Sequence, residues 1–503
     1  MLFKKLLFSS ATQQKAQEFG AFGGTSIDMT PIKMLSTESG QIIIVLKQYL
    51  LLFNANGQLI NQRRVNSGNA EFFDAMMING TTFAVGVINY TFASTYGAIG
   101  YLRFAIANSL SISQLDSYAY SAQIGWSSRS YYYVDSISSS LPFSNAKLFY
   151  KNSQEVYLAN CEFNESIRLT KYNEDTDSVV WSRRINFAGF YSNFQARNIK
   201  NVNLTGLVVS GSQITVLGTY TYYENVWYDD GYAEYDNFNY GFYVTLNSSG
   251  SPTSSTLFSR AVSSGSLPWS THLTNCFFDS ANDKIHITGF HKNVNNSIAL
   301  FKFERPYVLD IPNVSTLINL PSRHRMSGGN YYLDRPFGIA YNTTNQQTYI
   351  NGQKDTDYSF SGLNKQSLRK FPLYGTQGVG YVTKEINPVF FGSLLGKECI
   401  VSADGSSLLT ATTWGTRLVL AGHNLEDLAF LEGQGTRTIS GTEFDGMSDH
   451  GVDQYYYSAL VRLLSDRIPD PSTIISVTSA TSPYIGIYLV VVGSSSDIKS
   501  ISP

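Results

Sequence analysis

The sequence predicts an all-β protein built from one repeated unit, a small antiparallel sheet of four strands. Three observations carry this prediction. Aromatic residues make up 14% of the chain, with 34 Tyr and 31 Phe, and aromatic and β-branched residues favour strands over helices. A short apolar strand that ends in a small residue recurs along the whole chain. Turn residues separate the apolar runs, which is typical of hairpins.

The recurring strand sets the size of the unit. Successive copies lie about 60 to 70 residues apart, which is enough for four strands and their loops. The alternatives are a pair of β-sandwiches and a β-helix; a β-helix would show a shorter repeat of about 20 to 30 residues. Seven copies occur, and their small residues are Gly86, Ala159, Gly218, Gly289, Gly352, Gly422 and Gly493.

The segments around these copies complete the unit. An apolar run and a tight turn precede most copies, as in 72–81, so they form the first and second strands of one hairpin. Third and fourth strands follow in 167–186 and 243–262. Four-stranded sheets repeated at this spacing resemble the blades of β-propeller repeat proteins. The resemblance implies a fold and no particular activity.

The ends of the chain bear on the blade count. The last copy ends at Gly493, close to the C-terminus, while residues 50–66 have the character of a third and fourth strand. We therefore expect seven blades, with residues 50–66 completing the last one and closing the ring. A competing count treats residues 32–65 as a complete blade and gives eight. In either case residues 1–30 form an N-terminal arm and residues 31–503 a single propeller domain.

Composition excludes several classes of function. Only 15% of residues are charged and the net charge is -2, so there is no clustered basic face for a nucleic acid. Three cysteines without CxxC spacing predict neither a zinc site nor a disulfide framework. No apolar run approaches the roughly 20 residues of a membrane-spanning helix. The sequence contains no nucleotide, flavin or nucleophilic-hydrolase motif, so we expect no cofactor and no enzymatic activity.

The longer connections are predicted to lie on one face of the propeller, where a rigid scaffold could gather them into a binding surface. They are residues 87–99, 120–144, 186–203, 220–240, 319–336, 353–366 and 436–470. The segment 220–243 stands out because aromatic rings alternate with carboxylates, and such rings suit protein interfaces and sugar stacking alike. Its predicted binding residues are Tyr222, Tyr223, Trp227, Tyr228, Tyr232 and Tyr235.

Two other interpretations of this segment stay open. Its carboxylates could bind Ca²⁺ through oxygen ligands, although their spacing does not match an EF-hand loop. The calcium candidates are Asp229, Asp230, Glu234 and Asp236. The segment could also fold over its own blade without binding anything.

The low charge and the Tyr, Asn and Ser-rich β composition are similar to those of tailed-phage virion proteins. That similarity implies a structural or binding protein of a virus particle, a tail or capsid-associated component located in the virion. Its partners would be other virion proteins or a host-surface receptor, within an oligomeric assembly. The alternatives are an extracellular or cell-surface propeller that binds a saccharide, and a glycoside hydrolase. The hydrolase alternative rests on Ser402, Asp404, Gly405 and Trp414, which resemble the Asp-box turn of sialidase-type propellers, although the glycine is out of register and no second copy occurs.

Overall fold

The computed structural model describes most of the chain as strands and tight turns. All regular secondary structure in the described residues is β-strand. None of those residues forms a helix that could cross a membrane. The described residues are 17–19, 30–55, 59–64, 70–90, 96–107, 111–123, 146–162, 166–186, 199–227, 233–258, 270–281, 283–292, 304–311, 318–319, 334–355, 364–372, 382–386, 394–414, 417–429, 474–479 and 487–491.

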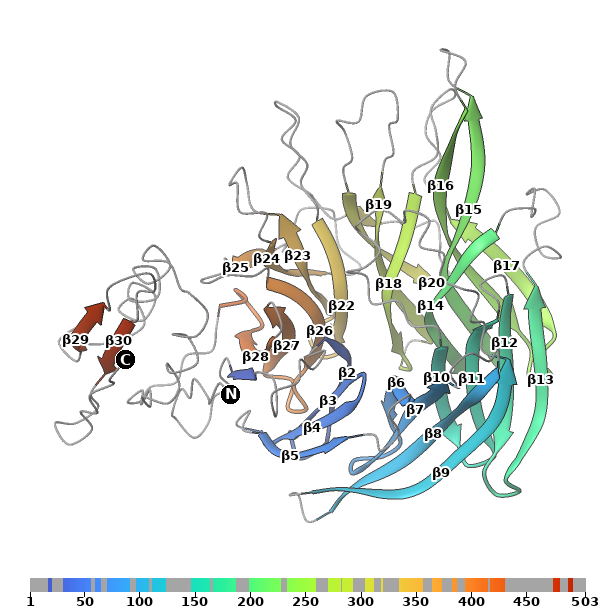
Figure 1. Ribbon diagram of the computed structural model, residues 1–503, viewed down its shortest axis with the longest axis horizontal. Helices are drawn as coiled ribbons and strands as arrows, with labels where there is room; N and C mark the ends of the chain where they lie inside the picture. The colour runs from blue at the N-terminus through green and yellow to red at the C-terminus, as the bar shows by residue number, and fades with distance from the viewer. Residues whose placement is uncertain are drawn as a thin grey trace.

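Six sheets each consist of four consecutive antiparallel strands (Figure 1). The first three sheets are β2 (Pro31–Ser36), β3 (Ile42–Leu46), β4 (Tyr49–Phe53) and β5 (Leu59–Arg64); β6 (Ala70–Met77), β7 (Thr82–Tyr90), β8 (Tyr96–Ala107) and β9 (Ser111–Gln123); and β10 (Ala146–Asn152), β11 (Glu155–Glu162), β12 (Ser166–Asn173) and β13 (Ser178–Asn186). The next three are β14 (Ile199–Ser210), β15 (Gln213–Trp227), β16 (Ala233–Leu246) and β17 (Pro252–Phe258); β18 (Ser270–Asp279), β19 (Lys284–Lys292), β20 (Glu304–Ile311) and β21 (Ile318–Asn319); and β22 (Asp334–Asn342), β23 (Gln347–Asp355), β24 (Asn364–Pro372) and β25 (Val382–Ile386).

A further four-stranded sheet joins the two ends of this series. It contains β26 (Leu394–Val401), β27 (Ser407–Trp414) and β28 (Arg417–Asn424), and its fourth strand is β1 (Gln17–Phe19) from the N-terminal region. β1 pairs antiparallel with β28, with Glu18 opposite Val419. The remaining strands, β29 (Ile474–Ser479) and β30 (Ile487–Val491), pair with each other in a two-stranded sheet.

The first strands of the four-stranded sheets lie side by side around a common axis. Each of β2, β6, β10, β14, β18, β22 and β26 contacts the next, and β26 contacts β2. We call these the innermost strands. Figure 1 shows the sheets following one another in chain order, with β2 beside β26. This arrangement is an all-β propeller with four-stranded blades.

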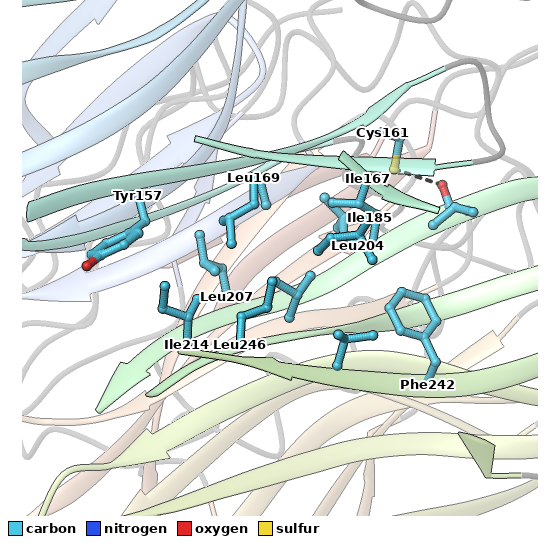
Figure 2. Packing of buried hydrophobic residues seen from close by; sticks show 14 of the residues in the cluster. Tyr157, Cys161, Ile167, Leu169, Ile185, Leu204, Leu207, Ile214, Phe242 and Leu246 are labelled. Atoms are coloured by element: carbon cyan, nitrogen blue, oxygen red, sulfur yellow. Dashed lines mark hydrogen bonds between the residues drawn. The ribbon is translucent and has the colours of Figure 1, made fainter. Parts of the chain in front are cut away.

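Apolar side chains fill the spaces between neighbouring sheets, as expected when both faces of each sheet are covered. Leu169 and Ile185 of one sheet pack against Leu204 and Phe242 of the next (Figure 2). An equivalent cluster joins β2–β5 to the last four-stranded sheet through Ile44, Leu51, Leu409 and Leu420. Apolar cores therefore hold neighbouring blades together, both within the series of sheets and across the junction between its first and last sheets.

The structure corrects the predicted closure. Residues 50–66 do not complete the last blade, because β4 and β5 pair with β3 and complete the first sheet. The reason is local: Gly40 adopts a positive φ of 77° in the β2–β3 turn, and Ile42–Leu46 is wholly buried as a second strand. The assignment of 32–65 to one blade, made for the competing count, is the one the structure has. The closing strand is β1, within the segment predicted as an arm.

The copy of the recurring strand at Gly422 also differs from its prediction. Gly422 lies on β28, the third strand of its sheet, and not on a second strand. Gly493 lies outside the described residues, and the preceding strand β30 pairs with β29 alone among those that are described. A similar apolar strand ending in a small residue can therefore occupy different places in a blade.

Candidate functional site

The aromatic segment 220–243, which was predicted as a loop, is mainly strand. β15 runs to Trp227 and β16 begins at Ala233, and their register is unbroken from Ile214 opposite Leu246 to Trp227 opposite Ala233. The prediction of a connection over 220–240 is therefore wrong at both ends. Tyr, Thr, Val and Trp favour extended backbone. The hairpin pairing therefore continues along the chain as far as such residues follow one another.

This hairpin extends beyond the rest of its blade. The pairing of β14 with β15 ends at Tyr222, and the pairing of β17 with β16 ends at Gly241. Residues 223–227 and 233–237 consequently pair only with each other among the described residues. Figure 1 shows β15 and β16 rising past the neighbouring strands. We call these two segments the projecting hairpin.

The predicted binding residues are divided by the structure. Tyr222 is the last residue of β15 that pairs with strands on both sides, β14 and β16. Tyr223, Trp227 and Tyr235 belong to the projecting hairpin. Tyr228 and Tyr232 lie outside the described residues.

The calcium candidates are divided in the same way. Glu234 and Asp236 lie on β16, where Asp236 is opposite Glu224. Asp229 and Asp230 lie outside the described residues, and the part of the chain that is described contains no group of three acidic, His or Cys residues that could hold a metal ion.

A second candidate site lies at the propeller axis. Six of the innermost strands share a register shift in which one residue is skipped relative to the second strand, and the skipped residues are Ile32, Phe73, Thr205, Thr274, Phe337 and Lys397. The residues that follow are Lys33, Asp74, Gly206, Asn275, Gly338 and Glu398. Such bulges redirect side chains, and they are common next to functional sites.

Four of these residues, together with Lys147 of β10, form what we call the axial cluster. Asn275 Nδ2 donates a hydrogen bond of 3.0 Å to Glu398 Oε1. Asp74 accepts from two backbone amides, that of Ala75 at 3.0 Å and that of Leu148 at 3.1 Å. The axial cluster is thus Lys33, Asp74, Lys147, Asn275 and Glu398, from five different innermost strands.

The charges of this cluster act on one another. Burial raises the pKa of Glu398, and Asp74 adds to the rise, while Lys33, Lys147 and Asn275 oppose it; the result is a pKa of about 7. Burial lowers the pKa of Lys33, but the negative charges of Glu398 and Asp74 outweigh burial and leave that pKa raised. A carboxyl group that titrates near neutrality, among two ammonium groups, is the kind of perturbed constellation found at functional sites.

Two glycines allow the innermost strands to approach at this level. A Cβ on Gly338 would lie 2.7 Å from the backbone nitrogen of Cys399, and a Cβ on Gly206 would collide with the sulfur of Cys276. Because Gly206 of β14 and Gly338 of β22 carry no side chain, these two positions leave room for the longer polar groups of the other innermost strands.

Only a weak sequence signal marks the axial cluster. Its members are charged or amide residues within innermost strands that contain both apolar and other polar residues, as Asp74 in Ala70–Met77 and Lys33 in Pro31–Ser36. By contrast, the Asp-box-like segment forms the β26–β27 turn. There Asp404 accepts from Ser402 Oγ at 2.5 Å and from the Ser406 amide at 3.1 Å. These bonds lower the pKa of Asp404 and stabilise an exposed turn.

No protein-family model matches the sequence, and no curated protein matches it. Solved structures resemble it at low identity. The β-propeller domain of Cps50 (Swd1) from Myceliophteria thermophila is 9% identical, with a TM-score of 0.39 over 78% of this chain and 96% of that one. An ulvan lyase is 11% identical, with a TM-score of 0.43 over 81% and 97% of the two chains. The periplasmic gluconolactonase of Pseudomonas aeruginosa is 10% identical, with a TM-score of 0.40 over 81% and 94%.

Proposed function

We propose that the chain is a binding protein whose propeller presents the projecting hairpin to a protein partner. The observation that carries the proposal is the extension of β15 and β16 beyond the strands that flank them in their blade. In this proposal the platform is a closed ring of seven blades. The contact of β26 with β2 and the pairing of β1 with β28 support that closure.

The chemistry of the hairpin suits a protein interface. Tyr223, Trp227 and Tyr235 lie within it, and Tyr and Trp supply large contact areas at low entropic cost. Beyond Tyr222 and Gly241 no third strand pairs with the hairpin in the described part of the chain. Unpaired strand edges are templates for an added strand of a partner. A two-stranded ribbon alone is marginally stable in water, so continuity with the blade is what keeps it extended.

The setting that we propose is a virus particle, with the chain as a tail or capsid-associated component. The partner is then another virion protein or a host-surface receptor, and the chain is one subunit of an oligomeric assembly. Composition supports this setting: only 15% of residues are charged and 14% are aromatic. Such a surface relies on amide, hydroxyl and aromatic groups for its contacts.

A photo-crosslinking amino acid placed at position 227 tests the proposal. The matched control places the same amino acid at Ser249, an exposed residue in the turn at the other end of β16. Since β16 contains 14 residues, the two probes lie about 40 Å apart at roughly 3.3 Å per residue. Irradiation of the native assembly should attach a partner to the position-227 variant and not to the position-249 variant.

Mass spectrometry of the adduct then identifies the partner. A virion protein or a host-surface protein supports the proposed setting, whereas an adduct with neither contradicts it. Equal labelling at both positions, or none at either, would overturn the role of the hairpin.

A further inference from the structure

The two ammonium groups of the axial cluster differ from its carboxylates in their contacts. Lys33 and Lys147 are partly exposed, whereas Asp74 and Glu398 are 7% and 8% exposed. Asp74 is held by two backbone amides and Glu398 by Asn275. Within the part of the chain that the structure describes, no hydrogen bond or ion pair is found for the ammonium group of Lys33 or Lys147.

Backbone geometry places both lysines at the level of Asp74 in the ring. Lys33 follows the bulge of β2 as Asp74 follows the bulge of β6, and Asp74 accepts a hydrogen bond from the amide of Leu148, the residue after Lys147. Each lysine opposes the rise in the pKa of Glu398, and each also acts on the Cys276 thiol. They reach this level from β2 and β10, with β6 between them in the ring. The carboxylate of that intervening strand, Asp74, is the one already bound to backbone amides.

We propose that Lys33 and Lys147 together bind a small oxyanion, of the carboxylate or sulfate and phosphate class, on the propeller axis. Each ammonium group offers three N–H donors, and hydrogen bonds between charged partners are about twice as strong as neutral ones. Partial burial reduces solvent screening and strengthens the attraction. Asp74 and Glu398 accept their hydrogen bonds from Ala75, Leu148 and Asn275 and not from the two lysines, so both ammonium groups keep their donors for a ligand.

Glu398 regulates this site because its carboxylate competes with the bound anion. The groups that face it are Lys33 of β2, Asp74 of β6, Lys147 of β10 and Asn275 of β18, with Cys399 adjacent on its own strand. Protonation of Glu398 removes a negative charge and favours the oxyanion, and the oxyanion in turn favours protonation. Because the pKa is about 7, the protonated fraction falls about tenfold between pH 6 and pH 8.

Titration calorimetry of the full chain tests the site with sodium sulfate and sodium acetate, used separately at constant ionic strength maintained with sodium chloride. Both probes keep their charge between pH 6 and pH 8, so any pH dependence comes from the protein. We expect saturable one-site binding of at least one probe, about tenfold tighter at pH 6 than at pH 8. Sulfate binding assigns a tetrahedral oxyanion and acetate binding a carboxylate.

Substitutions separate the site from general salt effects. Lys33→Met and Lys147→Met should each weaken binding at least tenfold. Lys384→Met, on the exposed surface of β25, should leave binding unchanged. Arginine at position 33 or 147 keeps the charge and should retain binding, which controls for variants that fold poorly.

Glu398→Gln gives the most direct test, because Gln retains the oxygen that accepts from Asn275. This variant should bind about tenfold more tightly than the parent at pH 8 and should lose the pH dependence. Absence of saturable binding by both probes, or unchanged binding in the two methionine variants, would overturn the proposal. A Glu398→Gln variant with the parent's pH dependence would overturn the role of Glu398.

Discussion

Asn275 and Glu398 are joined by a 3.0 Å hydrogen bond although they come from strands that are not neighbours in the ring. β22 lies between β18 and β26, and its residue at this level is Gly338. Because Gly338 has no side chain, the amide of Asn275 and the carboxylate of Glu398 can meet past it. The bond depends on the whole ring and on no local stretch of sequence.

Asn275→Ala should therefore lower the free energy of unfolding, and by an amount that depends on pH. Removing a donor from a buried acceptor costs about 1 to 3 kcal/mol in free energy of unfolding. The cost should be larger at pH 8.5 than at pH 5.5, because Glu398 is ionised only at the higher pH and a charged acceptor forms the stronger bond. Urea denaturation at the two pH values measures it, and an equal loss at both would contradict this account.

Most of the fold was predictable because it is written in local patterns. The apolar strand over 213–219, the turn at Gly211 before it and the part of β16 from Tyr243 onward follow from strand propensity and turn chemistry. The closing strand was not predictable in this way, since Gln17–Phe19 is short and has no apolar alternation. Its place is set by the open edge of β28, which exists only after the blades have formed.

The axial cluster was missed for a related reason. Lys33 and Glu398 are far apart in sequence, and nothing in the pattern of its own strand marks either residue as part of a site. Their meeting depends on bulges, and a bulge moves a side chain by one position without a clear sequence signature. The aromatic segment at Tyr222 was found because its composition is unusual locally, although its strand conformation was not.

Glu398→Gln should change how stability depends on pH. In the native state the pKa of Glu398 is about 7, against an ordinary value of 4.5, so the native state holds the extra proton between these pH values. Stability from this group is therefore greatest below about pH 4.5 and falls as pH rises through 7. The difference amounts to about 3 kcal/mol. Relative to the parent, the variant should gain this amount between pH 4.5 and pH 7.5 in urea denaturation; a constant difference would contradict the assignment.

His423 should have the opposite effect. The pKa of His423 is lowered from 6.5 to about 4: burial and the charge of Lys384 lower it, and a hydrogen bond with the backbone of Leu428 opposes them. The native state excludes a proton that the unfolded chain binds, so stability is present above pH 6.5 and is lost as pH falls toward 4. His423→Gln should reduce this loss, by about 3 kcal/mol at most, in denaturation curves recorded from pH 7 to pH 4.

The contributions of Glu398 and His423 to the free energy of unfolding oppose each other between about pH 4.5 and 6.5. In that range the contribution of Glu398 falls as pH rises, and the contribution of His423 increases. In the parent protein, these two groups together should therefore cause little change in the free energy of unfolding with pH in that range. Each single variant exposes the slope of the other, and the double variant should restore a flat response. Parallel curves for all four proteins would contradict both assignments.

Gly338→Ala tests the close approach of β22 to β26. The added Cβ would lie 2.7 Å from the Cys399 nitrogen and 2.8 Å from the Glu398 carbonyl carbon, and neither backbone atom can move aside alone. Overpacking of this kind costs about 1 to 3 kcal/mol. Gly80→Ala is the matched control, because its Cβ meets only the carboxylate end of the exposed Glu38 side chain. Urea denaturation should show a loss below about 0.5 kcal/mol for this control; similar losses in both variants would contradict the close approach.

Replacing residues 223–237 with Asn-Gly tests whether the projecting hairpin serves binding and not folding. Tyr222 is opposite Phe238, and a two-residue type I′ turn can close that pair. The removed strand residues pair only with each other in the described structure, so the free energy of unfolding should change by less than about 1 kcal/mol. The shortened chain should still bind the axial oxyanion, whose ligands lie on β2 and β10, but it should no longer capture the partner cross-linked at position 227. A loss of several kcal/mol would mean instead that the hairpin is part of the blade's own core, because only buried apolar contacts lose stability on that scale.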